Sequence, residues 1–129
     1  ADLLEHAALA AVDPERVRAY AEDFFEQRLY GDALEFFFKL DDAQGIRRVK
    51  AVALREGNPE LLWRIMHRNR SSVSRGDWIE CGENAMRQEK HRNAAYAFMR
   101  AGDAARQAEA EAHFKPPSPP PAAPPAPKG

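Results

Sequence analysis

A cluster of basic side chains lies between residues 64 and 75 of this 129-residue chain. Its members are Arg64, His67, Arg68, Asn69, Arg70 and Arg75. Cations grouped beside an aromatic ring, here Trp63, can hold a phosphate group or an RNA base. The cluster has no glycine-rich phosphate loop and no known RNA-binding signature. We therefore favour a solvated loop or a contact for an acidic protein, and keep RNA or another polyanion as the alternative ligand.

No residue pattern in the chain indicates catalysis. Nucleophile elbows, Walker-type loops and His-Glu pairs at metal spacing are all missing. The four histidines show no paired helical spacing, so we expect neither a metal site nor a cofactor; they are His6, His67, His91 and His113. Acids such as Asp41 and Asp42 are better explained as helix caps. The sequence therefore predicts a protein that is not an enzyme.

The chain contains one cysteine, Cys81, and so cannot form an internal disulfide. It lies on an apolar helical stripe, where we expect a small buried side chain rather than a reactive thiol. This fits a reducing compartment, and we expect the cytoplasm. No apolar run approaches the roughly 20 residues that span a bilayer, so no membrane partner is expected. The first residue is Ala rather than Met, which is consistent with a piece of a longer chain.

Charge is distributed unevenly along a chain whose net charge is only −1. Residues 1–44 hold eleven acidic against four basic side chains, a balance of −7. Residues 45–75 hold eight basic against two acidic ones, a balance of +6. An acidic end and a basic middle are therefore expected if the fold stacks its elements in chain order.

Apolar residues recur at helical spacing throughout, and no segment alternates as a strand would. Asp13-Pro14 and Asn58-Pro59 are cap-then-proline signals for helix starts, and Gly57 is a C-terminal signal. We expect a turn around residues 30–32 before a helix over 33–40, a loop over 70–76, and Asp77 as the next cap. The Phe36-Phe37-Phe38 run cannot face one way, so at least one ring should meet a neighbouring hairpin or a ligand. The predicted hairpins are about 14–40, 43–69 and 77–101, flanked by helices 2–12 and 104–114.

The sequence repeats with an offset of sixty-one residues. This shift aligns buried-type positions of the first and third hairpins: Val17 with Trp78, Ala21 with Gly82, Phe25 with Met86, Ala33 with Ala94, and Phe37 with Phe98. Each hairpin would cover its neighbour's apolar face, as in repeat proteins. The predicted fold is all-α, a short stack of antiparallel hairpins with about seven to eight helices, over a domain of residues 1–114.

The third hairpin resembles the tetratricopeptide repeat. The positions that carry this resemblance are Trp78, Cys81-Gly82, Ala85, Ala94, Phe98 and Ala101, although Cys81 replaces the usual Leu and Ala85 the usual Tyr. Arg106 stands where the closing Pro would be, and the middle hairpin is shorter than the family's unit. The resemblance implies an α-solenoid that binds other proteins, as an adaptor or scaffold.

In that family the first helix of each hairpin lines a groove that takes a peptide or helix of a partner protein. In this family, residues beside the apolar stripe would reach the partner. The matching positions of the third hairpin are Ile79, Glu83, Met86 and Arg87, and the sixty-one-residue shift gives Arg18, Glu22, Phe25 and Glu26 in the first. The middle hairpin would add Arg47 and Lys50. The same residues mix charge with apolar surface, as a recognition face does. The alternative is an ordinary solvated flank.

Residues 115–129 are a proline-rich tail or linker, and the stretch 115–128 holds eight of the ten prolines. We expect it to be extended polyproline II or disordered. Pro116-x-x-Pro119 and Pro124-x-x-Pro127 have a form that an SH3-type or other polyproline reader binds, but neither has a basic residue at the usual spacing. A linker to a further domain is the favoured interpretation. A structural segment of a larger multidomain enzyme is a further alternative for the chain as a whole.

Overall fold

The fold is that of a computed structural model, which describes residues 13–116. Seven α-helices and one 3-10 turn make up this part of the chain, and it contains no strand. They are α2 (Pro14–Glu26), α3 (Tyr30–Lys39), α4 (Ala43–Glu56), α5 (Pro59–Arg68), η1 (Arg70–Ser72), α6 (Arg75–Arg87), α7 (His91–Ala101) and α8 (Ala104–Glu111). The all-α prediction is confirmed. The helix expected over 2–12 and residues 117–129 of the tail lie outside the described residues.

Several helix starts were predicted correctly because a side chain satisfies the first free N–H groups. Asp13 Oδ1 accepts a hydrogen bond from the backbone N–H of Arg16, and Asp42 accepts one from Gly45. Asn58 accepts from the N–H groups of Glu60 and Leu61. Proline follows Asp13 and Asn58 at the first helical position, where its missing N–H has no cost.

Two predicted boundaries are wrong. The chain turns at residues 27–29, where Arg28 adopts a left-handed φ of 64°, so α3 already begins at Tyr30 and Gly31 lies inside it. Helix α6 begins at Arg75 rather than after Asp77. Ser74 is its N-cap, and the Asp77 carboxylate accepts a hydrogen bond from the Ser74 backbone N–H in a reciprocal capping box.

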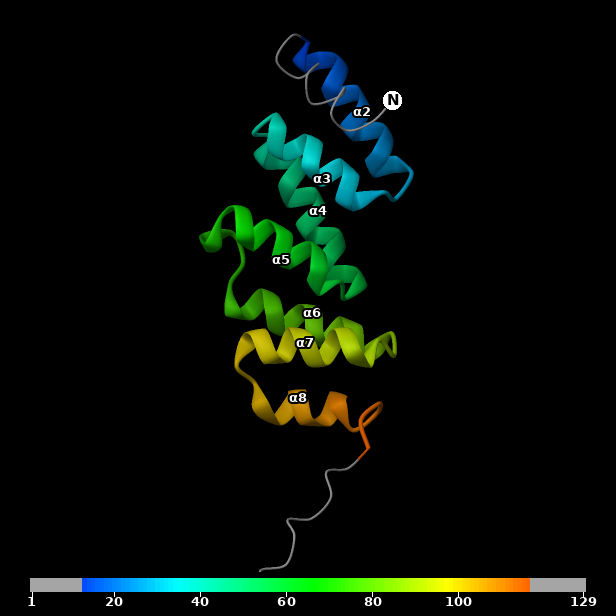
Figure 1. The fold of residues 1–129 in the computed structure, drawn as a ribbon, viewed down its shortest axis with the longest axis vertical. Coiled ribbons are helices and arrows are strands. Elements are labelled where there is room, and N and C mark those ends of the chain that lie inside the picture. The colour runs from blue at the N-terminus through cyan, green and yellow to red at the C-terminus, as the bar shows by residue number, and fades with distance from the viewer. Residues whose placement is uncertain (1–12, 117–129) are drawn as a thin grey trace, which may run out of the picture.

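The helices follow one another along the long axis of the molecule, from α2 at one end to α8 at the other (Figure 1). Helices α2 and α3, α4 and α5, and α6 and α7 form the three predicted hairpins. Helix α4 also packs on α3 and α6, α5 on α7, and α7 on α8. In the second and third hairpins, the first helices therefore pack on each other, and so do the second helices.

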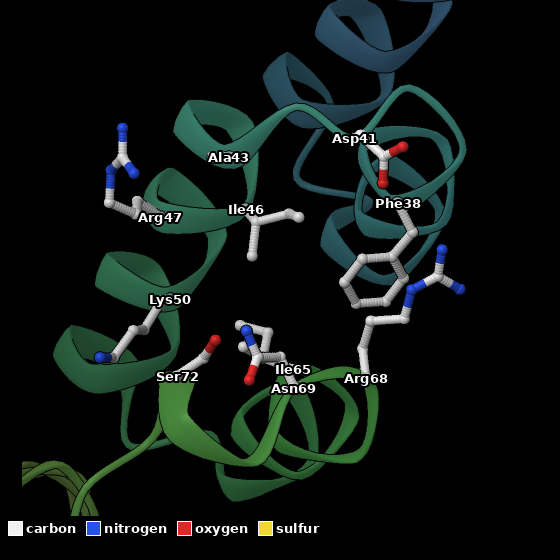
Figure 2. Close-up of a pocket in the computed structure, with 10 residues that line it drawn as sticks. All are labelled: Phe38, Asp41, Ala43, Ile46, Arg47, Lys50, Ile65, Arg68, Asn69 and Ser72. Carbon is white, nitrogen blue, oxygen red and sulfur yellow. The ribbon is translucent and has the colours of Figure 1, made fainter.

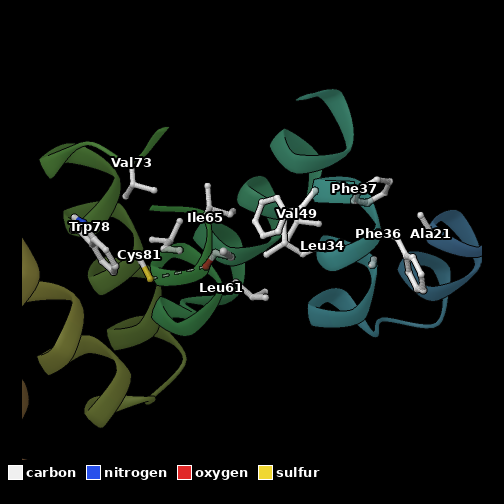
Figure 3. Close-up of a cluster of buried hydrophobic side chains, with 14 of the residues drawn as sticks. Ala21, Leu34, Phe36, Phe37, Val49, Leu61, Ile65, Val73, Trp78 and Cys81 are labelled. Carbon is white, nitrogen blue, oxygen red and sulfur yellow. Dashed lines mark hydrogen bonds between the residues drawn. The ribbon is translucent and has the colours of Figure 1, made fainter. Parts of the chain in front are cut away.

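Buried side chains form one large core cluster that extends from α2 to α7 (Figure 3), and a second, smaller cluster among α6, α7 and α8. Four of the five pairs aligned by the sixty-one-residue shift are buried in both copies, among them Val17 with Trp78 and Phe37 with Phe98. Phe25 and Met86 are half-buried. The three consecutive phenylalanines separate as expected. Phe36 stacks on Phe24 of α2, Phe37 lies over Gly45 of α4, and Phe38 turns toward α5.

The third hairpin also holds the carboxyl end of α4. Helix α4 ends at Gly57 in the left-handed conformation. Four side chains from α6, α7 and the turn between them donate to four consecutive backbone carbonyls: Asn84 to Leu54, Gln88 to Arg55, Lys90 to Glu56 and Asn93 to Gly57. This junction satisfies carbonyls that the helix leaves unpaired and fixes the second hairpin against the third.

Candidate functional site

A cavity of about 600 Å³ lies where the end of α3, the start of α4 and the end of α5 meet (Figure 2). We call it the basic groove. Its lining consists of Phe38, Asp41, Ala43, Ile46, Arg47, Lys50, Ile65, Arg68, Asn69 and Ser72. The volume falls in the range of small ligand sites, which is roughly 300 to 1,000 Å³.

The floor of the basic groove is apolar. Phe38 is 8% exposed and Ile65 is 1% exposed, and both belong to the core. Ile46 is half-buried, and its side chain projects from α4 toward Phe38 and Ile65 (Figure 2). Phe38 reaches this position because Phe36 and Phe37 occupy the other two faces of α3. The floor can therefore receive an apolar side chain from a ligand.

Three cationic residues also belong to the lining of the basic groove. The Arg68 guanidinium lies 5.2 Å from the centre of the Phe38 ring, a cation–π distance. Lys50 Nζ lies 2.8 Å from an oxygen of Asp77, which neutralises part of its charge. Arg47 belongs to the lining and is exposed, and its guanidinium extends along the outer side of α4, away from Phe38 (Figure 2). Against these three cations, Asp41 is the one carboxylate of the lining.

Polar groups close the remaining side. Asn69 Oδ1 accepts hydrogen bonds from both the backbone N–H and the hydroxyl of Ser71, which orients its side chain beside η1. Ser72 brings a hydroxyl to the same side (Figure 2). The groove thus offers an apolar floor, a positively charged rim and hydrogen-bonding groups, a set that suits a ligand with an apolar group next to a carboxylate or phosphate.

The groove joins two residue sets that the sequence kept apart. Arg47 and Lys50 come from the predicted partner-binding set, and Arg68 comes from the predicted basic patch. Phe38, Ile46 and Ile65 were not predicted as site residues. The one signal for Phe38 was the phenylalanine run, which required at least one ring to face away from its own hairpin.

Other members of the partner-binding set connect successive hairpins. The first helix of each hairpin is joined to the first helix of the next by ion pairs, and α6 is joined to α8 in the same way. The pairs are Arg18–Asp42 at 3.2 Å, Glu22–Arg48 at 2.6 Å, Lys50–Asp77 at 2.8 Å and Glu83–Arg106 at 2.8 Å. Because each of these side chains already faces an opposite charge, the four pairs offer a partner little uncompensated charge, and Lys50 brings only part of its charge to the basic groove.

The rest of that set is divided between packing and exposure. Phe25 lies under the Arg48 guanidinium at 4.3 Å, while Ile79 and Met86 pack against the core clusters. Glu26 and Arg87 are exposed, and Arg87 contacts Asn84 and Glu83 of its own helix. Their role in partner binding stays a prediction.

Three members of the predicted basic patch gather at one cavity. Arg64, His67 and Arg68 line a second cavity of about 370 Å³, together with Glu35, Phe38 and Trp63. Arg75 instead donates through Nε to the carbonyl oxygen of Ala101 at 2.8 Å. It therefore ties the start of α6 to the end of α7.

Within residues 13–116 no helix is both long and apolar enough to span a membrane. Comparison with protein-family models, with curated proteins and with solved structures finds no match to this chain.

Proposed function

We propose that the chain is a non-catalytic adaptor, built as a tetratricopeptide-like hairpin stack, that binds an acidic and partly apolar segment of a partner protein in the basic groove. The observation that carries this proposal is that Arg47, Lys50 and Arg68 line the same cavity as the apolar side chains of Phe38 and Ile65. A short peptide or one face of a helix presents such a combination of side chains. A partner leucine or phenylalanine would occupy the floor, and a neighbouring Asp or Glu would face the cations.

The chemistry of the cations supports an acidic ligand. Arginine binds a carboxylate through two parallel N–H···O bonds, and burial beside an apolar floor strengthens this contact relative to water. Arg68 is already oriented by the Phe38 ring, so less side-chain freedom is lost on binding. The neighbouring Lys50–Asp77 pair keeps the α4 side of the groove in place.

A peptide-display experiment tests the proposal on the full chain. Random peptides are selected on the wild-type protein and on the double variant Arg47→Glu/Arg68→Glu. We expect the wild type to enrich sequences with Asp or Glu next to a large apolar residue, and the double variant to lose them. Arg16→Glu is the matched control, because Arg16 is an exposed residue of the first turn of α2, where a negative charge is favourable. Equal enrichment by the wild type and the double variant would refute the proposal.

A second candidate is a single-stranded RNA or another polyanion. It is favoured by the exposed Trp63 ring, which stacks on His67 at a centroid distance of 4.9 Å beside Arg64 and Arg68. Affinity for an RNA oligonucleotide would fall steeply between about 50 and about 200 mM salt, because phosphate binding releases counterions. A peptide bound mainly on the apolar floor would show a much weaker salt dependence. Titrations with each ligand at both salt concentrations distinguish the two functions.

A further inference from the structure

Two large aromatic side chains lie exposed on adjacent second helices of the stack. Trp63 of α5 is 41% exposed and Tyr96 of α7 is 36% exposed. With Pro59, Glu60 and Asn93 they line a cavity of about 270 Å³ between α5 and α7. We call it the aromatic groove; it shares no lining residue with the basic groove.

Both rings are held in position before any ligand arrives. Trp63 stacks on His67 with an interplanar angle of 16°, and Tyr96 meets the buried Trp78 edge-on at 6.2 Å. Asn93 is fixed as well, because its Nδ2 donates to the Gly57 carbonyl. A groove of fixed aromatic rings is the kind of surface that binds polyproline II segments, whose proline rings fit between the aromatic side chains. Indole N–H and phenol O–H groups can also donate to the carbonyls that such a segment leaves unpaired.

The chain supplies a segment of this chemistry itself. Residues 116–127 hold eight of its ten prolines. We propose that the proline-rich segment 117–128 binds in the aromatic groove of its own chain.

Distance and charge support this occupant. Helix α8 leads into the segment and packs on α7, which carries Tyr96, and α7 packs on α5, which carries Trp63. Neighbouring helix axes lie about 8 to 10 Å apart, and ten residues of polyproline II extend about 31 Å, so the segment is long enough. The charged side chain of the groove lining is Glu60, and the charged side chain of residues 117–129 is Lys128. Glu60 also pairs with Arg64 of its own helix at 3.7 Å and is 75% exposed, so the opposite sign of Lys128 adds a weak, solvent-screened attraction.

The indole N–H signal of Trp63 in a ¹H–¹⁵N NMR spectrum reports on the groove, and the backbone N–H signal of Val17, buried in α2, is an internal reference. The wild-type chain is compared with a full-length variant in which Pro119, Pro120, Pro121, Pro124 and Pro125 are changed to Ser. We expect the Trp63 signal to move and the Val17 signal to stay. Ser118→Ala, within the same segment, is the matched control and should leave both signals in place.

A synthetic peptide of residues 117–129 is then added to the proline-to-serine variant. It should return the Trp63 signal toward its wild-type position, with an affinity about tenfold weaker after Tyr96→Ala, as expected for loss of a central aromatic contact. A Trp63 signal that ignores the proline substitutions would overturn the proposal. So would a signal that changes with protein concentration, because that would assign the groove to the segment of a second copy.

Discussion

The side-chain amide of Asn84 donates a hydrogen bond of 2.7 Å to the backbone carbonyl oxygen of Leu54, thirty residues earlier in the chain. Leu54 lies in the last turn of α4, whose carbonyls have no partner within the helix. Gln88, Lys90 and Asn93 continue the same pattern over the next three carbonyls. The third hairpin therefore contacts the carboxyl end of α4 through its backbone carbonyl groups.

Removing this contact should destabilise the stack. Asn84 is partly buried in the junction, and Asn84→Ala leaves the Leu54 carbonyl only the longer bond of 3.3 Å from the Gly57 backbone N–H. The change should lower the free energy of unfolding by about 1 kcal/mol. Urea unfolding followed by circular dichroism measures the change. Glu80→Ala, at an exposed position of the same helix, is the control and should change stability by less than about 0.5 kcal/mol. An Asn84→Ala chain as stable as the control would show that solvent replaces the bond at no cost.

Two glycines of α6 should respond to alanine in opposite directions. A Cβ atom at Gly82 would lie 2.6 Å from the ring of Phe98, so Gly82→Ala overpacks the helix contact and should cost about 1 to 3 kcal/mol. At Gly76 the nearest atom that a Cβ would meet is the Ser74 hydroxyl oxygen at 3.7 Å, so Gly76→Ala should stabilise the chain by about 0.5 to 1 kcal/mol. Urea unfolding of both variants checks the pair. Equal effects would contradict the close approach of α6 and α7.

Local signals in the sequence predicted much of the fold because they act over a few residues. The Asp13-Pro14 and Asn58-Pro59 pairs locate helix starts by satisfying nearby N–H groups. The turn at residues 27–29 was missed because it depends on Arg28, a non-glycine residue in the left-handed conformation. No local signal marks such a residue, since neighbouring helices select its conformation.

The basic groove was harder to predict, because its members meet only through tertiary packing. Arg68 reaches the Phe38 ring from thirty residues away, and this requires α3 and α5 to approach each other. The helical stripe at Glu22 identified a flank of α2, but it could not show that Arg48 of the next hairpin already pairs with it. Hydrophobic periodicity shows which face of a helix is buried, but it does not show which other helix packs against that face.

Asp77 should make stability depend on pH in the acidic range. Burial alone would raise the pKa of its carboxyl, but the hydrogen bonds from Lys50 and from the Ser74 backbone more than offset this and hold the pKa below 3.8. The stabilisation is therefore complete above the unfolded pKa of 3.8 and is lost as the pH falls through the lower folded value. Asp77→Asn should reduce the unfolding free energy by about 1 to 2 kcal/mol at neutral pH. Its difference from the wild type should shrink below about pH 4 in urea titrations. A difference that is constant down to the acid limit would contradict the ion pair with Lys50.

Cys81 should be protected from thiol reagents in the folded chain. Its side chain is fully buried between α6 and the end of α4, and burial raises the pKa of the thiol from 9.0 to about 12. Because only the thiolate reacts, this pKa alone lowers the reactive fraction roughly a thousandfold near pH 8, before restricted access is counted. Alkylation by iodoacetamide, followed by mass spectrometry across a urea series, should therefore track the unfolded population. The variant Cys81→Ala/Glu80→Cys carries its thiol at an exposed position of α6 instead, and we expect it to react at a similar rate with and without urea. Rapid alkylation of the wild type without urea would show that α6 separates from α4 in the native state.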